Sequence, residues 1–434
     1  ILWHNQIEYP YRLAVGQALY ISDGNTVEGR KLLYTSGYAY PFINEEVLEE
    51  TLPYLDGLKV FSYGFTLEGE LIPPMSDDAW MIERAQQWGT RPILTLTPLG
   101  EDGHFNNNLV SALVRSHELQ QRIIWELGST MQEKGFGGLD IDFEYVLADD
   151  REGFAAFVGL ATRVMNLFGY PVTVALAPKT SAEQRGLLYE GIDYALLGAA
   201  ANRAMLMTYE WGYSQGPPMA VAPINMVRRV VDYAVTAIPR EKLSLGIPNY
   251  GYDWALPYER GVTRAKTINN HQAVQLAIDF GVDIRFDETA MSPYFRYWQY
   301  GIQHEVWFED VRSIKAKFDL IKEYELSGVG YWQLMSLFRA NWLMLNEMFY
   351  IEREWPVMER LDGTSQARVE ELRLRAGRPL TLVCPEGERT VPGAEAPVRS
   401  MDLSLVLEIA TQASAHTALE RVRNGFFTVR GGHR

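Results

Sequence analysis

The sequence is poor in cysteine and in positive charge. Cys384 is the single cysteine among 434 residues, which excludes an intrachain disulfide and metal sites built on cysteine pairs. Lys and Arg number 40 against 55 Asp and Glu, for a formal net charge of −15. Such a surface repels phosphate backbones, so we expect no nucleic acid partner. No apolar run reaches the roughly 18 residues of a membrane span. The P-loop motif G-x-x-x-x-G-K-[ST] is also missing, so we expect no ATP binding.

The bulk composition is that of a globular protein. Hydrophobic residues make up 47% and charged residues 22%, and the length leaves room for one large domain with one or two small ones. Aromatic residues make up 12%, which suits a large core or a sugar-binding surface, and composition alone favours the core. The chain starts at Ile1 rather than Met, so we expect a cut N-terminus, and a missing signal peptide then says nothing about secretion.

Strand-like and helix-like segments alternate along most of the chain. Apolar, β-branched or aromatic runs followed by turn residues occupy positions 32–42, 58–65, 91–99, 137–146, 170–179, 204–211, 242–251 and 328–336. Amphipathic stretches separate most of them. Eight such repeats predict an α/β fold, a (β/α)8 TIM barrel over residues 28–355. Residues 252–306 are too long for one helix and contain strand-like pieces, which predicts a small α+β insertion between strands seven and eight.

Both ends of the chain differ from this pattern. The first 25 residues resemble the closing half of a LysM domain, a module that binds N-acetylglucosamine polymers. The matching residues are Asn5, Leu13, Val15, Gly16, Gln17, Leu19 and Ile21. Half a module cannot bury its own core, so we expect a LysM remnant, with an ordinary linker as the alternative.

At the other end we place a domain boundary near 356–364. The segments EELRLRAGRPL and TVRGGHR, within residues 365–434, resemble the N-terminal part of stage III sporulation protein AA. The nucleotide-binding domain of that ATPase would follow GGHR, so the resemblance also implies no ATP binding in this chain. The alternative is an unrelated C-terminal α+β appendage.

An acidic triplet marks the fourth predicted strand. Side chains alternate along a strand, so Asp140, Asp142 and Glu144 share one face and the apolar residues between them take the other. Neighbouring carboxyls can share a proton, which raises the pKa of one of them. Active sites of barrels lie at the C-terminal ends of their strands, so Glu144 is suited to donate a proton to a glycosidic oxygen. An edge strand with a solvated acidic face is one alternative. A metal site is another, weakened by the few His residues nearby, and we expect neither a metal nor a cofactor.

The triplet resembles the Asp-x-x-Asp-x-Asp-x-Glu signature of glycoside hydrolase family 18. The last three acids are present, and the first would fall near Gly137 and is missing. The resemblance implies that Glu144 is the acid/base, that Asp142 holds the acetamido group of the sugar, and that Asp140 relays charge beneath it. It also implies retaining catalysis in which the 2-acetamido oxygen of the substrate is the nucleophile, so the substrate is a polymer containing N-acetylglucosamine.

Further site residues follow from the same resemblance. The stretch from Met207 to Trp211 resembles the family's Met-x-Tyr-Asp segment, with Glu210 in place of Asp. Tyr209 would donate its hydroxyl to the acetamido carbonyl, and Trp332 would form the floor under the reacting sugar. The expected substrate contacts are Met207, Glu210, Trp211 and Trp332, with Tyr38 and Phe65 at the ends of the first two strands. For any of these aromatic residues alone, a place in the core is the better interpretation.

Three segments narrow the resemblance. Residues 208–224, 175–179 and 245–254 resemble the LysM-bearing bacterial branch that acts on spore cortex peptidoglycan. This implies cleavage of β-1,4 N-acetylglucosaminyl linkages, a place in sporulation or germination, and a location in the spore, the cell wall or outside the cell. Two alternatives stay open: a chitinase or chitooligosaccharide hydrolase, and a non-catalytic protein that binds N-acetylglucosamine polymers.

Overall fold

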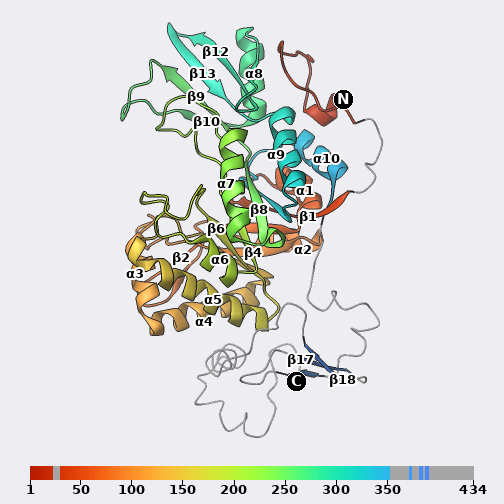
Figure 1. Cartoon of the computed structure of the whole chain (residues 1–434). Coiled ribbons are helices and arrows are strands. Elements are labelled where there is room, and N and C mark those ends of the chain that lie inside the picture. Colours follow the sequence, from red (N-terminus) through yellow and green to blue (C-terminus); the bar gives the residue numbers. More distant parts are fainter. Residues whose placement is uncertain (23–29, 352–370, 374–380, 385–386, 391–434) are drawn as a thin grey trace. The chain divides into compact units, whose positions relative to one another are not determined.

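The structure is a computed structural model that describes residues 1–22, 30–351, 371–373, 381–384 and 387–390 (Figure 1). One ten-stranded sheet has the order β15-β1-β14-β8-β7-β6-β5-β4-β2-β3, and β1 also pairs with β2. Its eight parallel barrel strands are β1 (Lys31–Ala39), β2 (Gly57–Phe65), β4 (Arg91–Leu96), β5 (Gly138–Ile141), β6 (Val172–Leu176), β7 (Arg203–Leu206), β8 (Leu243–Pro248) and β14 (Gly328–Trp332). Because the β1–β2 pairing closes the sheet, the predicted (β/α)8 barrel is confirmed.

Helices follow most of the barrel strands. They are α1 (Glu45–Thr51), α2 (Ala79–Gln87), α3 (Asn107–Arg115), α4 (His117–Lys134), α5 (Arg151–Leu167), α6 (Tyr194–Ala200), α7 (Ile224–Ala237), α9 (Val311–Glu323) and α10 (Arg339–Met348). Short 3-10 helices lie at Trp3–Asn5, Leu52–Tyr54, Ala148–Asp150 and Arg240–Lys242, and the two-residue strand β3 (Leu71–Ile72) and β15 (Phe349–Ile351) extend the sheet. The barrel strands are buried along nearly their whole length, as expected for parallel strands covered by helices.

The barrel residues fall into two compact units. The first contains Ile1–Lys59, Ala175–Gln184 and Arg203–Arg353, and the described part of the second contains Val60–Val174 and Arg185–Asn202. In the second unit, Phe143 stacks on Phe154 of α5, with ring centroids 5.4 Å apart, and lies 6.3 Å from the ring of Phe157. Such aromatic contacts hold the end of β5 against its covering helix.

The first unit includes the predicted insertion between β8 and β14. Strands β9 (Gly251–Leu256), β10 (Lys266–Ile268), β11 (Arg285–Asp287), β12 (Ser292–Gln299) and β13 (Ile302–Trp307) form an antiparallel sheet in the order β10-β9-β13-β12-β11. Helix α8 (Asn270–Phe280) packs against one face of this sheet through Ala273 and Ala277, which meet Phe295 and Tyr297 of β12. The insertion therefore has a hydrophobic core of its own.

The N-terminal segment packs against this insertion and against α10. The Ile284 amide donates to the Val15 carbonyl at 2.8 Å. Gly16 has a φ of +81°, and a Cβ there would lie 2.0 Å from the Ile284 carbonyl oxygen, so only glycine fits. The Arg12 guanidinium lies 3.2 Å from the Asp279 carboxylate. The LysM origin of residues 1–25 stays a prediction, and residues 23–25 lie outside the described residues.

The C-terminal region contributes three short strands. They are β16 (Glu371–Arg373), β17 (Thr381–Cys384) and β18 (Gly387–Thr390), and they form an antiparallel sheet. The predicted domain boundary near 356–364 and most of residues 365–434 lie outside the described residues, so the resemblance to sporulation protein AA stays a prediction.

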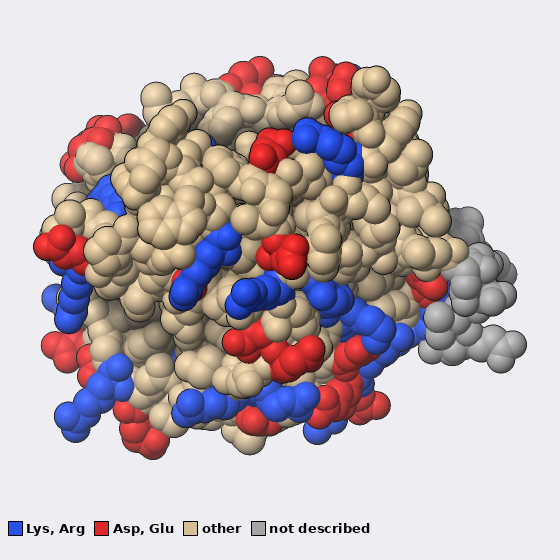
Figure 2. Space-filling model, turned by 90° about the horizontal axis from the view of Figure 1, so that it is seen from above, with Lys and Arg blue, Asp and Glu red and all other residues tan. Residues whose placement is uncertain are grey.

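No helix among the described residues combines the length and hydropathy needed to cross a membrane. Within the same residues, no three His, Cys, Asp or Glu side chains gather closely enough to hold a metal ion. Figure 2 shows Lys and Arg side chains interspersed with Asp and Glu on the visible face. On that face, charges of neither sign gather in one patch.

Candidate active site

The acidic triplet lies at the C-terminal end of β5, in the second unit. Asp140 is within the strand and has no solvent exposure. The strand ends at Ile141, although the Asp142 amide still donates to the Leu96 carbonyl at 2.9 Å. Asp142 is buried, whereas Glu144 is solvent-exposed. The prediction that all three acids lie within one strand is therefore wrong. The strand ends at Ile141, and Glu144 lies in the loop that follows.

The residues between the acids take the opposite side, as the alternation predicts. Leu139, Ile141 and Phe143 are all buried, and Phe143 meets the aromatic side chains of α5. A strand with acids on one side and large apolar residues on the other is fixed in register, because a shift by one residue would bury the carboxyls among the helices. Because Leu139, Ile141 and Phe143 pack toward the helices, the acids between them lie on the opposite side of the chain.

Asp140 is held by a neighbouring strand. Thr173 on β6 is paired with Asp140 in the register of the sheet, and its hydroxyl donates to Oδ1 of Asp140. On the other side Asp140 is paired with Thr95 of β4, whose buried hydroxyl has no hydrogen-bond partner among the described residues. Thr173 was not predicted from the sequence. The available signal was a hydroxyl within the otherwise apolar run VTVAL.

Met207 to Trp211 directly follow β7, in the first unit. Met207 and Tyr209 are buried, and Trp211 is half-buried. The Thr208 hydroxyl donates to the Gly246 carbonyl on β8 at 2.7 Å, which anchors the segment to the next strand. A Cβ at Gly246 would lie 2.2 Å from the Leu206 carbonyl oxygen and 2.9 Å from the Tyr209 ring. Glycine at that position therefore makes room for the tyrosine.

Glu210 is positioned by two tyrosines near the start of the insertion. The hydroxyls of Tyr250 and Tyr252 both donate to Oε1 of Glu210, the second at 2.9 Å. Glu210 itself has a left-handed backbone, with a φ of 66°. Although the residue is accessible to solvent, partial burial raises the pKa of its carboxyl, and the two hydroxyl donors act in the opposite direction. Burial also raises the pKa of both tyrosines, so they remain protonated donors.

Trp332 is the last residue of β14 and is half-buried, as expected of a sugar platform. The Tyr38 ring contacts it edge-on, with centroids 5.4 Å apart. Tyr38 is only 1% exposed, so it packs against Trp332 and offers almost no surface of its own to a sugar, unlike the pocket-lining place expected for it. The buried Lys59 of β2 donates to the Tyr38 hydroxyl at 3.2 Å and was also missed, although a lysine within the apolar run LKVF is a visible signal.

Phe65 also departs from its prediction. It has no solvent exposure, and its ring lies 6.0 Å from that of Phe143. It therefore packs on the side of the sheet that Phe143 takes and belongs to the core. Among the described residues, the remaining candidates form two groups: the acids on the second unit, and Met207, Tyr209, Glu210, Trp211 and Trp332 on the first.

Comparison with known proteins agrees with these features. Residues 100–336, more than half of the chain, match Glycosyl hydrolases family 18. The chain belongs to this family. It is therefore a glycosidase, and the predicted family is confirmed.

Relatives within family 18 cover most of the chain. It is 40% identical over 311 residues to the cortical fragment-lytic enzyme of Bacillus subtilis (strain 168), covering 71% of this chain and 72% of the relative. The enzyme of the same name from Bacillus anthracis is 37% identical over 341 residues, covering 77% of this chain and 78% of that one.

Solved structures show the same family-18 fold. The crystal structure of the Bacillus cereus spore cortex-lytic enzyme SleL superposes with a TM-score of 0.76 at 31% identity, covering 81% of this chain and 93% of that chain. A chitinase from Chromobacterium violaceum superposes with a TM-score of 0.68 at 24% identity, covering 73% of this chain and 98% of that chain. At that identity the likeness to the chitinase concerns the fold alone.

Proposed function

We propose that this chain hydrolyses β-1,4 N-acetylglucosaminyl linkages of spore cortex peptidoglycan, with Glu144 as the acid/base. The observation that carries the proposal is the acidic triplet at the end of β5, where Asp140 and Asp142 are buried and Glu144 reaches solvent. The likeness to cortical fragment-lytic enzymes over 71% of the chain supports the substrate. Such a substrate implies a location at the spore or cell wall.

The residues support a substrate-assisted mechanism. The acetamido oxygen of the bound sugar attacks the anomeric carbon while Glu144 donates its proton to the glycosidic oxygen, and that bond breaks. Glu144, now a carboxylate, then takes a proton from the water that attacks the same carbon and reopens the oxazolinium ring. The anomeric carbon is attacked twice, from opposite faces, so its configuration is retained.

The other residues orient the acetamido group and the ring. Asp142 would accept a hydrogen bond from the acetamido N–H. Asp140, oriented by Thr173, would relay charge to Asp142 through a proton that the two carboxyls share. Tyr209 would donate to the acetamido oxygen. Trp332, supported by Tyr38, would stack beneath the pyranose. Asp142, Tyr209 and Trp332 each lie at or just after the C-terminal end of a strand, which is where barrel active sites are built.

The experiment is mass spectrometry of the fragments released from purified spore cortex. We expect fragments that end in reducing N-acetylglucosamine, with colloidal chitin left intact, and no release by Glu144→Gln. Fragments ending in reducing muramic acid would contradict the proposed bond. Chitin hydrolysis at a rate equal to that on cortex would contradict the proposed substrate.

A further inference from the structure

One face of the insertion sheet carries an exposed aromatic and cationic surface. Phe295 and Tyr297 of β12 point into the core of the insertion, toward α8. Since side chains alternate along a strand, Tyr294, Arg296 and Trp298 lie on the opposite face. Trp298 is 64% exposed, and the side chain of Arg296 is 58% exposed. Together with Glu305 and Trp307 of β13, these three residues form what we term the outer face.

The outer face is an ordered surface. Tyr294 and Trp307 are paired across the two strands, and their rings stack with centroids 4.6 Å apart and an interplanar angle of 15°. In the next row, Glu305 accepts from Nε of Arg296 and from Nε1 of Trp307, each at 2.8 Å. Glu305 is buried, so it fixes both side chains from beneath.

Arg296 keeps donors available for a ligand. Its Nε donates to Glu305, and its two Nη groups make no hydrogen bond to the described residues. A guanidinium offers these N–H groups in a planar fork that matches a carboxylate. The chain as a whole has a net charge of −15 and would repel a strongly anionic ligand. The exposed Arg296, with aromatic residues on either side of it, therefore suits a ligand that is mostly uncharged and carries a single anionic group.

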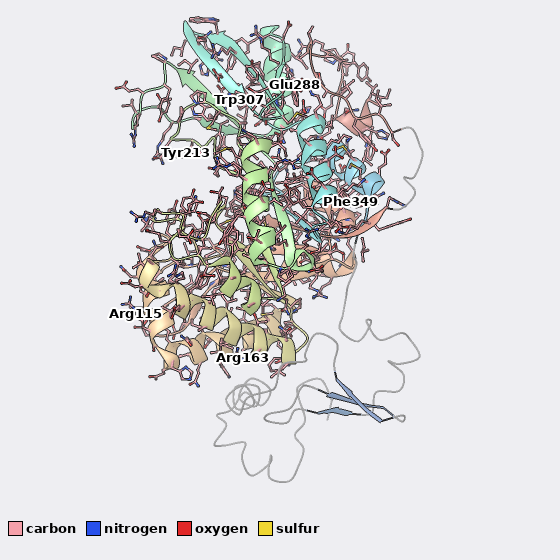
Figure 3. All side chains as sticks on the ribbon, viewed as in Figure 1. Arg115, Arg163, Tyr213, Glu288, Trp307 and Phe349 are labelled. Carbon is pink, nitrogen blue, oxygen red and sulfur yellow. The ribbon has the colours of Figure 1, made fainter. Side chains whose placement is uncertain are left out.

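The outer face is continuous with the segment after β7. Trp307 is paired with Tyr252 of β9, and Tyr252 donates to Glu210 at 2.9 Å. The row Tyr294–Trp307–Tyr252 thus leads across three neighbouring strands, about 4.8 Å apart, to a predicted substrate contact. Figure 3 labels Trp307 in the insertion sheet and Tyr213 in the loop that follows Glu210, both in the first unit.

We infer that the outer face binds a peptidoglycan strand beyond the cleaved sugar. Trp298 and the Tyr294–Trp307 stack would receive sugar rings, and Arg296 would bind a carboxylate of a stem peptide. Pyranose C–H faces pack on flat aromatic surfaces, and a stem peptide supplies the anion that chitin lacks. This inference rests on the proposed substrate. It adds a surface that selects strands carrying stem peptides.

Co-sedimentation of the full chain with insoluble glycans tests the inference. Glu144→Gln serves as the background, so that the glycan is not consumed. The glycans are cortex sacculi, the same sacculi stripped of stem peptides by an amidase, and colloidal chitin. The variants are Trp298→Ala, Arg296→Gln and Arg296→Lys. The controls are Trp88→Ala and Arg240→Gln, which change an exposed tryptophan and an exposed arginine outside the insertion.

Trp298→Ala should weaken binding to both kinds of sacculi about two- to tenfold, the range expected for one aromatic contact. Arg296→Gln should weaken binding about threefold on intact sacculi and leave stripped sacculi unaffected, and Arg296→Lys should restore part of the loss. Both controls should bind like the background.

Three results would overturn the inference. Unchanged binding by Trp298→Ala would exclude the aromatic surface. Equal loss by Arg296→Gln on intact and stripped sacculi would exclude the carboxylates of the stem peptides, because an amidase leaves a lactyl carboxylate on each stripped muramic acid. Self-association abolished by Trp298→Ala, with cortex binding intact, would assign the face to a second copy instead. Cortex hydrolysis by the unmodified chain is scored separately, so failure of the proposed function is distinguishable.

Discussion

The hydrogen bond from Thr173 to Asp140 leads to a test with a built-in control. Asp140 has no solvent exposure and lies between Thr173 on β6 and Thr95 on β4. Thr173 donates to it, whereas the Thr95 hydroxyl has no hydrogen-bond partner among the described residues. Thr173→Val removes one donor from a buried carboxyl and keeps the shape of the side chain. Thr95→Val removes a hydroxyl that makes no such bond.

Thr173→Val and Thr95→Val should therefore change the free energy of unfolding by different amounts, or in opposite directions. Removing one partner of a buried hydrogen bond costs about 1–3 kcal/mol, so Thr173→Val should lower the free energy of unfolding by about that amount. Thr95→Val should be neutral or slightly stabilising, because it relieves an unsatisfied buried hydroxyl. Thr173→Ser keeps the donor and should recover most of the loss. Urea unfolding followed by tryptophan fluorescence measures all three, at unchanged m-value.

Turnover on cortex adds a second measurement. If Asp140 accepts charge from Asp142, Thr173→Val should lower kcat with little change in KM, while Thr95→Val leaves both intact. Equal destabilisation by the two valine variants would refute the reasoning, because the effect would then reflect packing alone. A stable Thr173→Val protein with normal kcat would show that the hydrogen bond from Thr173 to Asp140 contributes neither to stability nor to turnover.

Three further changes test other parts of the site. Glu144→Gln should lower turnover on cortex by at least about 100-fold and alter the free energy of unfolding by less than about 0.5 kcal/mol, because the residue is exposed; reducing-end release and urea unfolding measure the two, and retained turnover would remove Glu144 from the mechanism. Gly246→Ala should cost about 1–3 kcal/mol in urea unfolding, because the added Cβ would lie 2.2 Å from the Leu206 carbonyl oxygen and 2.9 Å from the Tyr209 ring. An unchanged unfolding midpoint would mean that the backbone shifts to accept the Cβ at little cost. Because the pKa of Glu210 is raised in the folded state, the stability that this group contributes is present below its unfolded pKa, near 4.5, and is lost as pH rises through the folded value; Glu210→Gln should flatten that decline in unfolding measured from pH 4 to 8, and an identical slope in both proteins would contradict the assignment.

The prediction of the barrel from the sequence depended on local periodicity. Each of the eight apolar runs became a barrel strand, since a parallel strand buried on both sides needs a nearly continuous apolar stretch wherever it lies in the chain. The acidic triplet was predictable for a similar reason. The alternation of the three acids with Leu139, Ile141 and Phe143 is a local pattern of neighbouring residues, although β5 itself ends at Ile141.

Contacts between distant segments were decided by the tertiary structure alone. Phe65 and Tyr38 lie at the ends of barrel strands, as predicted, yet the first packs on Phe143 and the second contacts Trp332 edge-on. The bonds of Glu210 with Tyr250 and Tyr252, 40 and 42 residues further along, depend on the course of the chain from β7 to the start of the insertion.

What the sequence by itself determined was therefore the order of strands and helices, the acidic triplet at the end of β5 and the family signature. All three are encoded within a few neighbouring residues, because side-chain alternation and helical periodicity act over that range. The tertiary structure decided which side chains hold the acids, which aromatic residues remain open to a sugar, and which are core. Those outcomes depend on sheet register between strands that are far apart in the chain, and register is set by packing across the whole sheet.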